Sequence, residues 1–98
     1  MKLYRGDDGS PLRFPAFFTN TRSSAAQYAS FHRDGRVRVF DFKPRRTLVL
    51  RREPENYQSI FESAYDRDYD SIHWLDFEIA YDQWVVLDPD SLIEERSD

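Results

Sequence analysis

Two short apolar runs in the last third of the chain constrain its fold more than any other feature of the sequence. Residues 71–75 and 83–87 are rich in bulky, β-branched and aromatic side chains, which favour a pleated and buried strand. An acidic stretch separates the two runs. Asp88-Pro89-Asp90 ends the second run, because proline cannot donate to a β-ladder and aspartate favours turns. The pattern predicts two strands joined by an acidic turn, around which the rest of the domain is built.

Four segments of the first half also predict strands. Residues 3–6 form a short first strand that ends in a run of turn-forming residues. Pro15 lacks a backbone donor, so the short apolar segment 17–19 is expected at an edge of the sheet. Residues 36–42 alternate with period two, and residues 47–50 return after a short basic connection. We expect the last two segments to pair as a β-hairpin.

Two segments have the periodicity of helices. Residues 22–32 repeat small and aromatic side chains at helical spacing, and the three polar residues before them offer N-caps. Residues 54–66 begin with Pro54, which suits a first helical turn, and carry an apolar stripe at positions i, i+3, i+4, i+7 and i+8. Residues 94–98 show no such pattern and are expected to form a frayed tail.

The composition fits one compact domain over residues 1–98. The chain is 40% hydrophobic and contains 8 Phe, 6 Tyr and 2 Trp, whose large side chains can fill a core despite the short length. There is no cysteine, and no apolar run approaches the roughly 20 residues that span a bilayer. The N-terminus lacks the apolar segment of a signal peptide, so we expect a cytoplasmic protein without membrane contacts. We predict an α+β domain with a small, strongly twisted, mostly antiparallel sheet and two helices.

Charge is divided unevenly along the chain. Residues 1–52 carry twelve of the 14 Lys and Arg, whereas residues 53–98 carry 14 of the 18 Asp and Glu. Such asymmetry is typical of proteins with charged partners. The alternative is that the two halves lie side by side in one sheet and neutralise each other. The basic run in residues 43–52 could contact phosphates, but the net charge of −4 argues against direct binding of nucleic acids.

Three short motifs occur in an order that resembles one enzyme family. A Tyr-Arg-Gly motif contains Arg5, a Phe-Thr motif ends at Thr19 and precedes the helical segment with Tyr28, and an Asp-Gln-Trp-Val-Val-Leu-Asp-Pro run contains Gln83. This arrangement is similar to small ADP-ribosyltransferase-like domains of the arginine class, and the resemblance covers most of the chain. It implies an α+β domain that binds NAD and transfers ADP-ribose to a protein target.

The resemblance implies a role for each motif residue. Arg5 would contact the phosphates and ribose of NAD, for which a planar and permanently charged guanidinium is suited. Thr19 and Tyr28 would line the nicotinamide side of the site. The residue types alone also allow plainer interpretations: an ion pair of Arg5 with a nearby aspartate, a helix cap at Thr19 and a core position for Tyr28.

Gln83 stands where the family has a glutamate that contacts the ribose. A neutral amide can bond a ribose hydroxyl, but it offers no negative charge to a developing cation. Asp82 would supply that charge only if the strand register moved by one residue, because successive side chains point to opposite faces. Glu78 is a more distant candidate, and the alternative for both acids is a solvated turn. The candidate catalytic residues are therefore Arg5, Asp82 and Gln83, and we expect slow turnover or none.

The acids of the second half suggest a different class of function. A short acidic chain resembles small phage-encoded inhibitors, anti-CRISPR proteins among them, that block the basic nucleic-acid-binding surface of another protein. Opposed charges would speed encounter, and binding would weaken as salt rises. Tyrosines between the acids would act as anchors. The candidate contact residues are Glu62, Tyr65, Asp66, Asp68, Tyr69, Asp70, Asp76, Glu78, Tyr81 and Asp82.

Three alternating aspartates, Asp66, Asp68 and Asp70, begin like a calcium-binding loop. Ser71 replaces the glycine of the sharp turn, however, and Phe77 stands where a bidentate glutamate belongs. The two histidines have no partner at the spacing of metal ligands. We interpret the aspartates as an exposed acidic turn and expect no metal site.

Overall fold

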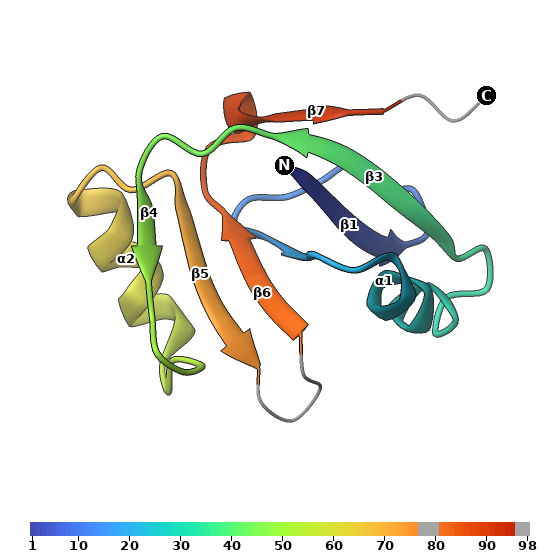
Figure 1. Ribbon diagram of the computed structural model, residues 1–98, viewed down its shortest axis with the longest axis horizontal. Coiled ribbons are helices and arrows are strands. Elements are labelled where there is room, and N and C mark those ends of the chain that lie inside the picture. The colour runs from blue at the N-terminus through green and yellow to red at the C-terminus, as the bar shows by residue number, and fades with distance from the viewer. Residues whose placement is uncertain (77–80, 96–98) are drawn as a thin grey trace.

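The computed structural model describes residues 1–76 and 81–95 (Figure 1). These residues form two α-helices, seven strands and one turn of 3₁₀ helix. In chain order the elements are β1 (Lys2–Asp7), β2 (Ala16–Thr19), α1 (Arg22–Ala29), β3 (Arg36–Phe42), β4 (Thr47–Val49), α2 (Tyr57–Asp66), β5 (Ser71–Asp76), β6 (Tyr81–Val86), η1 (Pro89–Ser91) and β7 (Leu92–Glu94).

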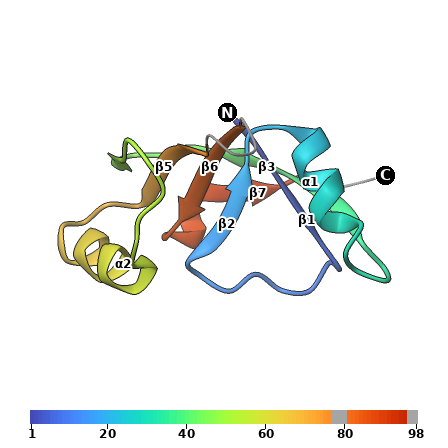
Figure 2. The same ribbon diagram turned by 90° about the horizontal axis from the view of Figure 1, so that it is seen from below.

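The strands form one twisted sheet in the order β4-β5-β6-β2-β1-β3-β7 (Figure 2). Within the described residues, every strand pairing is antiparallel except that of β4 with β5. The two helices lie near opposite ends of the sheet, with α1 beside β1 and β3 and α2 beside β4 and β5 (Figure 1). The architecture is the predicted α+β domain with a mostly antiparallel sheet and two helices.

Both faces of the sheet are buried by separate hydrophobic clusters. Val85 and Val86 are neighbours in β6 and are both fully buried, yet they belong to different clusters, because successive residues of a strand point to opposite faces. One cluster contains Phe42 and Trp84, whose ring centroids are 5.4 Å apart. The other joins Trp74 of β5 to apolar residues of α2. The second half of β6, residues 84–86, is therefore buried from both sides, as its apolar sequence favours.

α1 approaches β1 and β3 so closely that only glycine fits beneath it. A Cβ atom at Gly6 would lie 1.8 Å from the carbonyl oxygen of Ala25, and one at Gly35 would lie 1.7 Å from that of Ala29. Both contacts are with backbone, which cannot move aside as a flexible side chain can. The two glycines thus set the position of α1 relative to the sheet.

Three predictions about strand positions are wrong. β3 and β4 do not form a hairpin: β3 pairs with β1 and β7, whereas β4 pairs with β5 at the other end of the sheet. β2 lies between β1 and β6 rather than at an edge, and Pro15 precedes it, so its missing donor removes no ladder bond. Glu94 pairs with Phe40 in β7 and does not belong to a frayed tail.

Both helices are shorter than predicted. α2 begins at Tyr57, because the side-chain oxygen of Asn56 accepts the backbone N–H of Ser59 at 3.0 Å and caps the helix there. α1 ends at Ala29, and the chain continues as turns to Gly35, whose N–H bonds the carbonyl oxygen of His32. Most of the acidic turn between β5 and β6, residues 77–80, lies outside the described residues.

Candidate functional site

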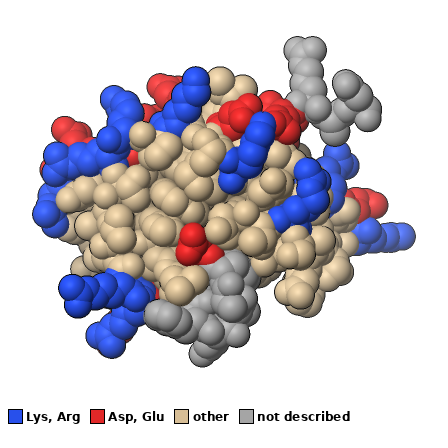
Figure 3. All heavy atoms as spheres, in the orientation of Figure 1, with Lys and Arg blue, Asp and Glu red and all other residues tan. Residues whose placement is uncertain are grey.

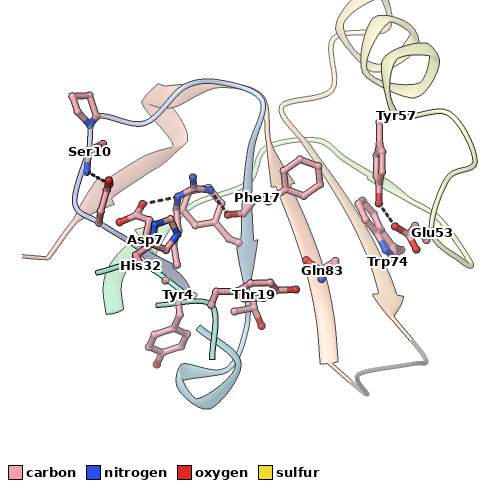
Figure 4. A pocket seen from close by; sticks show the side chains of 16 residues that line it. Tyr4, Asp7, Ser10, Phe17, Thr19, His32, Glu53, Tyr57, Trp74 and Gln83 are labelled. Carbon is pink, nitrogen blue, oxygen red and sulfur yellow. Dashed lines mark hydrogen bonds and ion pairs between the residues drawn. The ribbon is translucent and has the colours of Figure 1, made fainter. Parts of the chain in front are cut away.

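A pocket of about 510 Å³ lies on the sheet, with a row of four paired residues among those that line it (Figure 4). Tyr4 of β1 pairs with Thr19 of β2, Thr19 pairs with Gln83 of β6, and Gln83 pairs with Trp74 of β5. Directly paired residues of antiparallel strands point to the same face. Their side chains therefore cross four strands in one row. The volume is within the range of roughly 300–1,000 Å³ that is usual for small-molecule sites.

Arg5 reaches the same pocket although it follows Tyr4 in β1. Alternation directs the two side chains to opposite faces, but β1 and β2 diverge beyond the pair of Tyr4 and Thr19, which opens the sheet at this point (Figure 2). Arg5 Nε donates to Asp7 Oδ2 at 2.8 Å, and Nη1 donates to the carbonyl oxygen of Phe17 at 2.9 Å. The ion pair of Arg5 with a nearby aspartate therefore exists. It leaves Nη2 without a partner in the described part of the chain, and this nitrogen can bind an anion.

Asp7 fixes Arg5 and belongs to a wider network of charges. Its carboxylate also accepts the N–H of Gly9 at 2.8 Å and Arg38 Nη1 at 3.1 Å, and Arg38 makes two bonds to Glu94. Burial alone would raise the pKa of Asp7, but the Gly9 amide and the two arginines outweigh it and hold this pKa below its usual value. Asp7 is thus charged at neutral pH and keeps Arg5 in one orientation.

Thr19 and Tyr28 both line the pocket, and neither has the plainer role that the sequence allowed. Thr21, rather than Thr19, is the N-cap of α1, and Thr19 Oγ1 accepts the N–H of Thr21 at 3.3 Å. Tyr28 is 43% exposed and is not a core residue. Thr19 and Tyr28 are therefore both part of the pocket wall.

Gln83 and Asp82 are separated by the pleat of β6. Gln83 lines the pocket, whereas Asp82 does not. Asp82 instead lies beside Asn20, which donates to it at 3.1 Å, and its Oδ2 is 3.3 Å from His73 Nε2. The strand register is therefore not shifted by one residue, and Gln83 rather than Asp82 faces the pocket. The structure does not support Asp82 as a replacement for the missing glutamate. Glu78 lies outside the described residues.

One end of the pocket was not predicted from the sequence. Phe17, Tyr57 and Trp74 form an aromatic wall there, with the Tyr57 ring 5.6 Å from Phe17 and 6.1 Å from Trp74. The hydroxyl of Tyr57 donates to the carboxylate of Glu53, which also lines the pocket (Figure 4). The only sequence signal for this end is the apolar stripe of α2, because Glu53 lies in a loop whose position depends on how α2 packs.

The acidic contact surface is interrupted at its centre. Asp70 is only 3% exposed, and it accepts the backbone N–H groups of Arg45 at 2.7 Å and Arg46 at 3.2 Å. The prediction of an exposed turn is wrong at this residue, because Asp70 holds the connection before β4. The guanidinium groups of Arg46 and Arg67 lie 4.5 Å and 5.4 Å from the ring of Tyr69, so basic groups cover one of the predicted anchors.

The remaining residues of that surface differ in exposure. Glu62, Tyr65, Asp66 and Asp68 are exposed, although the Tyr65 hydroxyl is 3.4 Å from the carbonyl oxygen of Leu87 and burial raises its pKa. The side chains of Asp76 and Tyr81 lie outside the described residues. In Figure 3, Lys and Arg mark both ends of the visible face and a mostly neutral surface lies between them. Because Asp70 is buried and two arginines lie over Tyr69, the described residues of this surface do not form one continuous acidic patch.

The basic and acidic halves of the sequence interleave in the sheet. Arg38 of β3 binds Glu94 of β7 at 2.7 Å, and Arg45 binds Asp88 at 3.3 Å. Lys2 of β1 forms an ion pair with Glu95. Part of the charge asymmetry is therefore neutralised within the domain.

Comparison of the chain with known protein families, with curated proteins and with solved structures finds no match. None of the helices that the structure describes is long and apolar enough to cross a membrane. The described residues also contain no group of three or more His, Asp or Glu that could hold a metal ion.

Proposed function

We propose that the pocket binds NAD and that the domain transfers ADP-ribose from NAD to a protein target. The observation that supports this proposal is that Arg5, Thr19, Tyr28 and Gln83 all line one pocket. They come from three strands and a helix, and they are the residues that the motif resemblance associates with NAD. A chance resemblance of three short motifs would not be expected to select residues of a single pocket.

The chemistry of the pocket fits the parts of a dinucleotide. The guanidinium of Arg5 is held by Asp7 and retains donors for a diphosphate. The amide of Gln83 can bond a ribose hydroxyl. Phe17, in the aromatic wall, is 38% exposed and can contact a planar ring.

The proposal predicts slow turnover, because Gln83 carries no charge. Replacing Gln83 by Glu would add a carboxylate next to the ribose and should raise the rate at which nicotinamide is released from NAD. A rate that is unchanged or lower in Gln83→Glu would argue against the position assigned to the ribose.

Binding is tested by calorimetric titration of NAD into the wild type and two neighbouring variants of β6. Gln83→Ala removes a pocket residue and should weaken binding about fivefold, the usual effect of one lost hydrogen bond. Asp82→Ala changes the adjacent residue on the opposite face and should leave the affinity unchanged. Circular dichroism checks that both variants are folded.

Two results would reject the proposal. The first is the absence of heat with wild-type protein at millimolar NAD. The second is an equal loss of affinity in Asp82→Ala and Gln83→Ala, because a site in the pocket cannot depend equally on both faces of β6.

A further inference from the structure

We infer that Glu53 supplies the negative charge that Gln83 lacks, and that it stabilises the ribosyl cation formed when NAD is cleaved. This inference rests on the proposed function of the pocket. When the bond between ribose C1′ and the nicotinamide nitrogen breaks, both electrons stay with nicotinamide, which leaves as a neutral molecule. The ribose becomes an oxocarbenium-like cation. A nucleophile of the acceptor then forms a bond to C1′ and releases a proton to solvent. A fixed carboxylate beside C1′ lowers the energy of this cation.

Three carboxylates are found among the described residues that line the pocket: Asp7, Asp8 and Glu53. The carboxylate of Asp7 forms ion pairs with Arg5 and Arg38. Asp8 lies in the turn after β1, where its side chain accepts the N–H of Ser10. Of these three, only Glu53 lies at the end of the pocket that contains Tyr57 and Trp74, next to Gln83 in the row of paired residues.

A chain of contacts connects Glu53 to Gln83. Gln83 pairs directly with Trp74, and the Trp74 ring lies 6.1 Å from that of Tyr57. The Tyr57 hydroxyl donates to Glu53. Figure 4 shows Trp74, Tyr57 and Glu53 together at one end of the pocket, away from Asp7 and His32, with Gln83 between Thr19 and Trp74.

The contacts around Glu53 determine how its negative charge is paired and how its carboxylate is oriented. Within the described residues, no Lys, Arg or His forms an ion pair with this carboxylate. The Tyr57 ring is held edge to face against Phe17, with an interplanar angle of 88°, and therefore fixes the hydroxyl that orients Glu53. Glu53 is exposed, so its effect on a bound cation depends on how closely that cation approaches its carboxylate.

The test compares Glu53→Gln, which keeps the shape and removes the charge, with Glu55→Gln in the same loop, which does not line the pocket. Release of nicotinamide from NAD gives kcat, and calorimetry gives the affinity for NAD. Glu53→Gln should lower kcat by about a hundredfold and change the affinity less than about threefold. Glu55→Gln should change neither. Adding Gln83→Glu to Glu53→Gln should restore part of the lost rate, because a carboxylate is returned to the pocket.

The outcomes separate this inference from the proposed function. If the wild type does not bind NAD, the function of the pocket is rejected and the inference with it. If NAD binds but Glu53→Gln retains the wild-type kcat, only the role of Glu53 is overturned. The same conclusion follows if Glu53→Gln affects the affinity as strongly as kcat. If the wild type binds NAD and releases no nicotinamide, the proposed transfer of ADP-ribose is rejected together with the role of Glu53.

Discussion

Substitution of Gly6 by alanine should displace α1 and destabilise the domain strongly. The new Cβ atom would lie 1.8 Å from the carbonyl oxygen of Ala25 and 2.5 Å from the backbone nitrogen of Ala29. An ordinary contact is about 3.5 Å, so the helix and β1 must separate by roughly 1.5 Å. Overpacking of this kind against rigid backbone costs about 3 kcal/mol.

Urea unfolding measures this effect. With a slope of about 1.5 kcal/mol per molar, a loss of about 3 kcal/mol lowers the midpoint by about 2 M. Gly35→Ala should behave similarly, because its Cβ would lie 1.7 Å from the carbonyl oxygen of Ala29. Gly9→Ala is the contrast: its Cβ would meet the flexible side chain of Arg36 at 3.1 Å, and its positive φ of 84° costs about 1 kcal/mol. A midpoint of Gly6→Ala equal to or above that of Gly9→Ala would refute the close packing of α1.

Two further predictions concern carboxylates that the fold holds in place. Asp70→Ala should lower the unfolding free energy by about 3 kcal/mol in urea denaturation, because it leaves the N–H groups of Arg45 and Arg46 without their acceptor. Asp66→Ala changes an exposed residue and should alter the unfolding free energy by less than about 0.5 kcal/mol. Equal effects of the two substitutions would contradict the assigned role of Asp70. Lowering the pH should also destabilise the domain, because the pKa values of Asp7 and Glu94 are depressed in the folded state. The two carboxylates stabilise the fold fully above their pKa values in the unfolded chain, about 3.9 and 4.3, and this stabilisation is lost as the pH falls through their pKa values in the folded state. The urea midpoint should therefore fall between about pH 5 and pH 2, less steeply in Arg38→Gln, and identical slopes would show that Arg38 does not cause the shift.

The sequence predicts elements better than it predicts their neighbours. The alternation of residues 36–42 and the apolar stripe of α2 depend on local periodicity, and both elements are found close to the predicted positions. The hairpin failed because β4 finds its partner, β5, through contacts between distant residues. Nothing local to residues 47–50 specifies that choice.

In the candidate site, too, the sequence predicts individual residues better than it predicts which residues lie beside them. Arg5, Thr19, Tyr28 and Gln83 were selected by motif, and the pairing of strands brings three of them together. Glu53 could not be selected, because its place beside Tyr57 depends on the packing of α2 against Trp74. Asp70 was misjudged for a related reason: an aspartate in an acidic run is usually solvated, and only tertiary structure places the N–H groups of Arg45 and Arg46 over it.

The two tryptophans provide the most direct test that NAD binds in this pocket. Trp74 lines the pocket, whereas Trp84 lies in the cluster on the opposite face of the sheet. Each indole N–H gives its own signal in a proton–nitrogen NMR spectrum, and Trp74→Phe assigns the two signals. Titration with NAD should shift the signal of Trp74 and leave that of Trp84 nearly unchanged. A shift of Trp84 alone, or no shift of either signal at millimolar NAD, would contradict the proposed site.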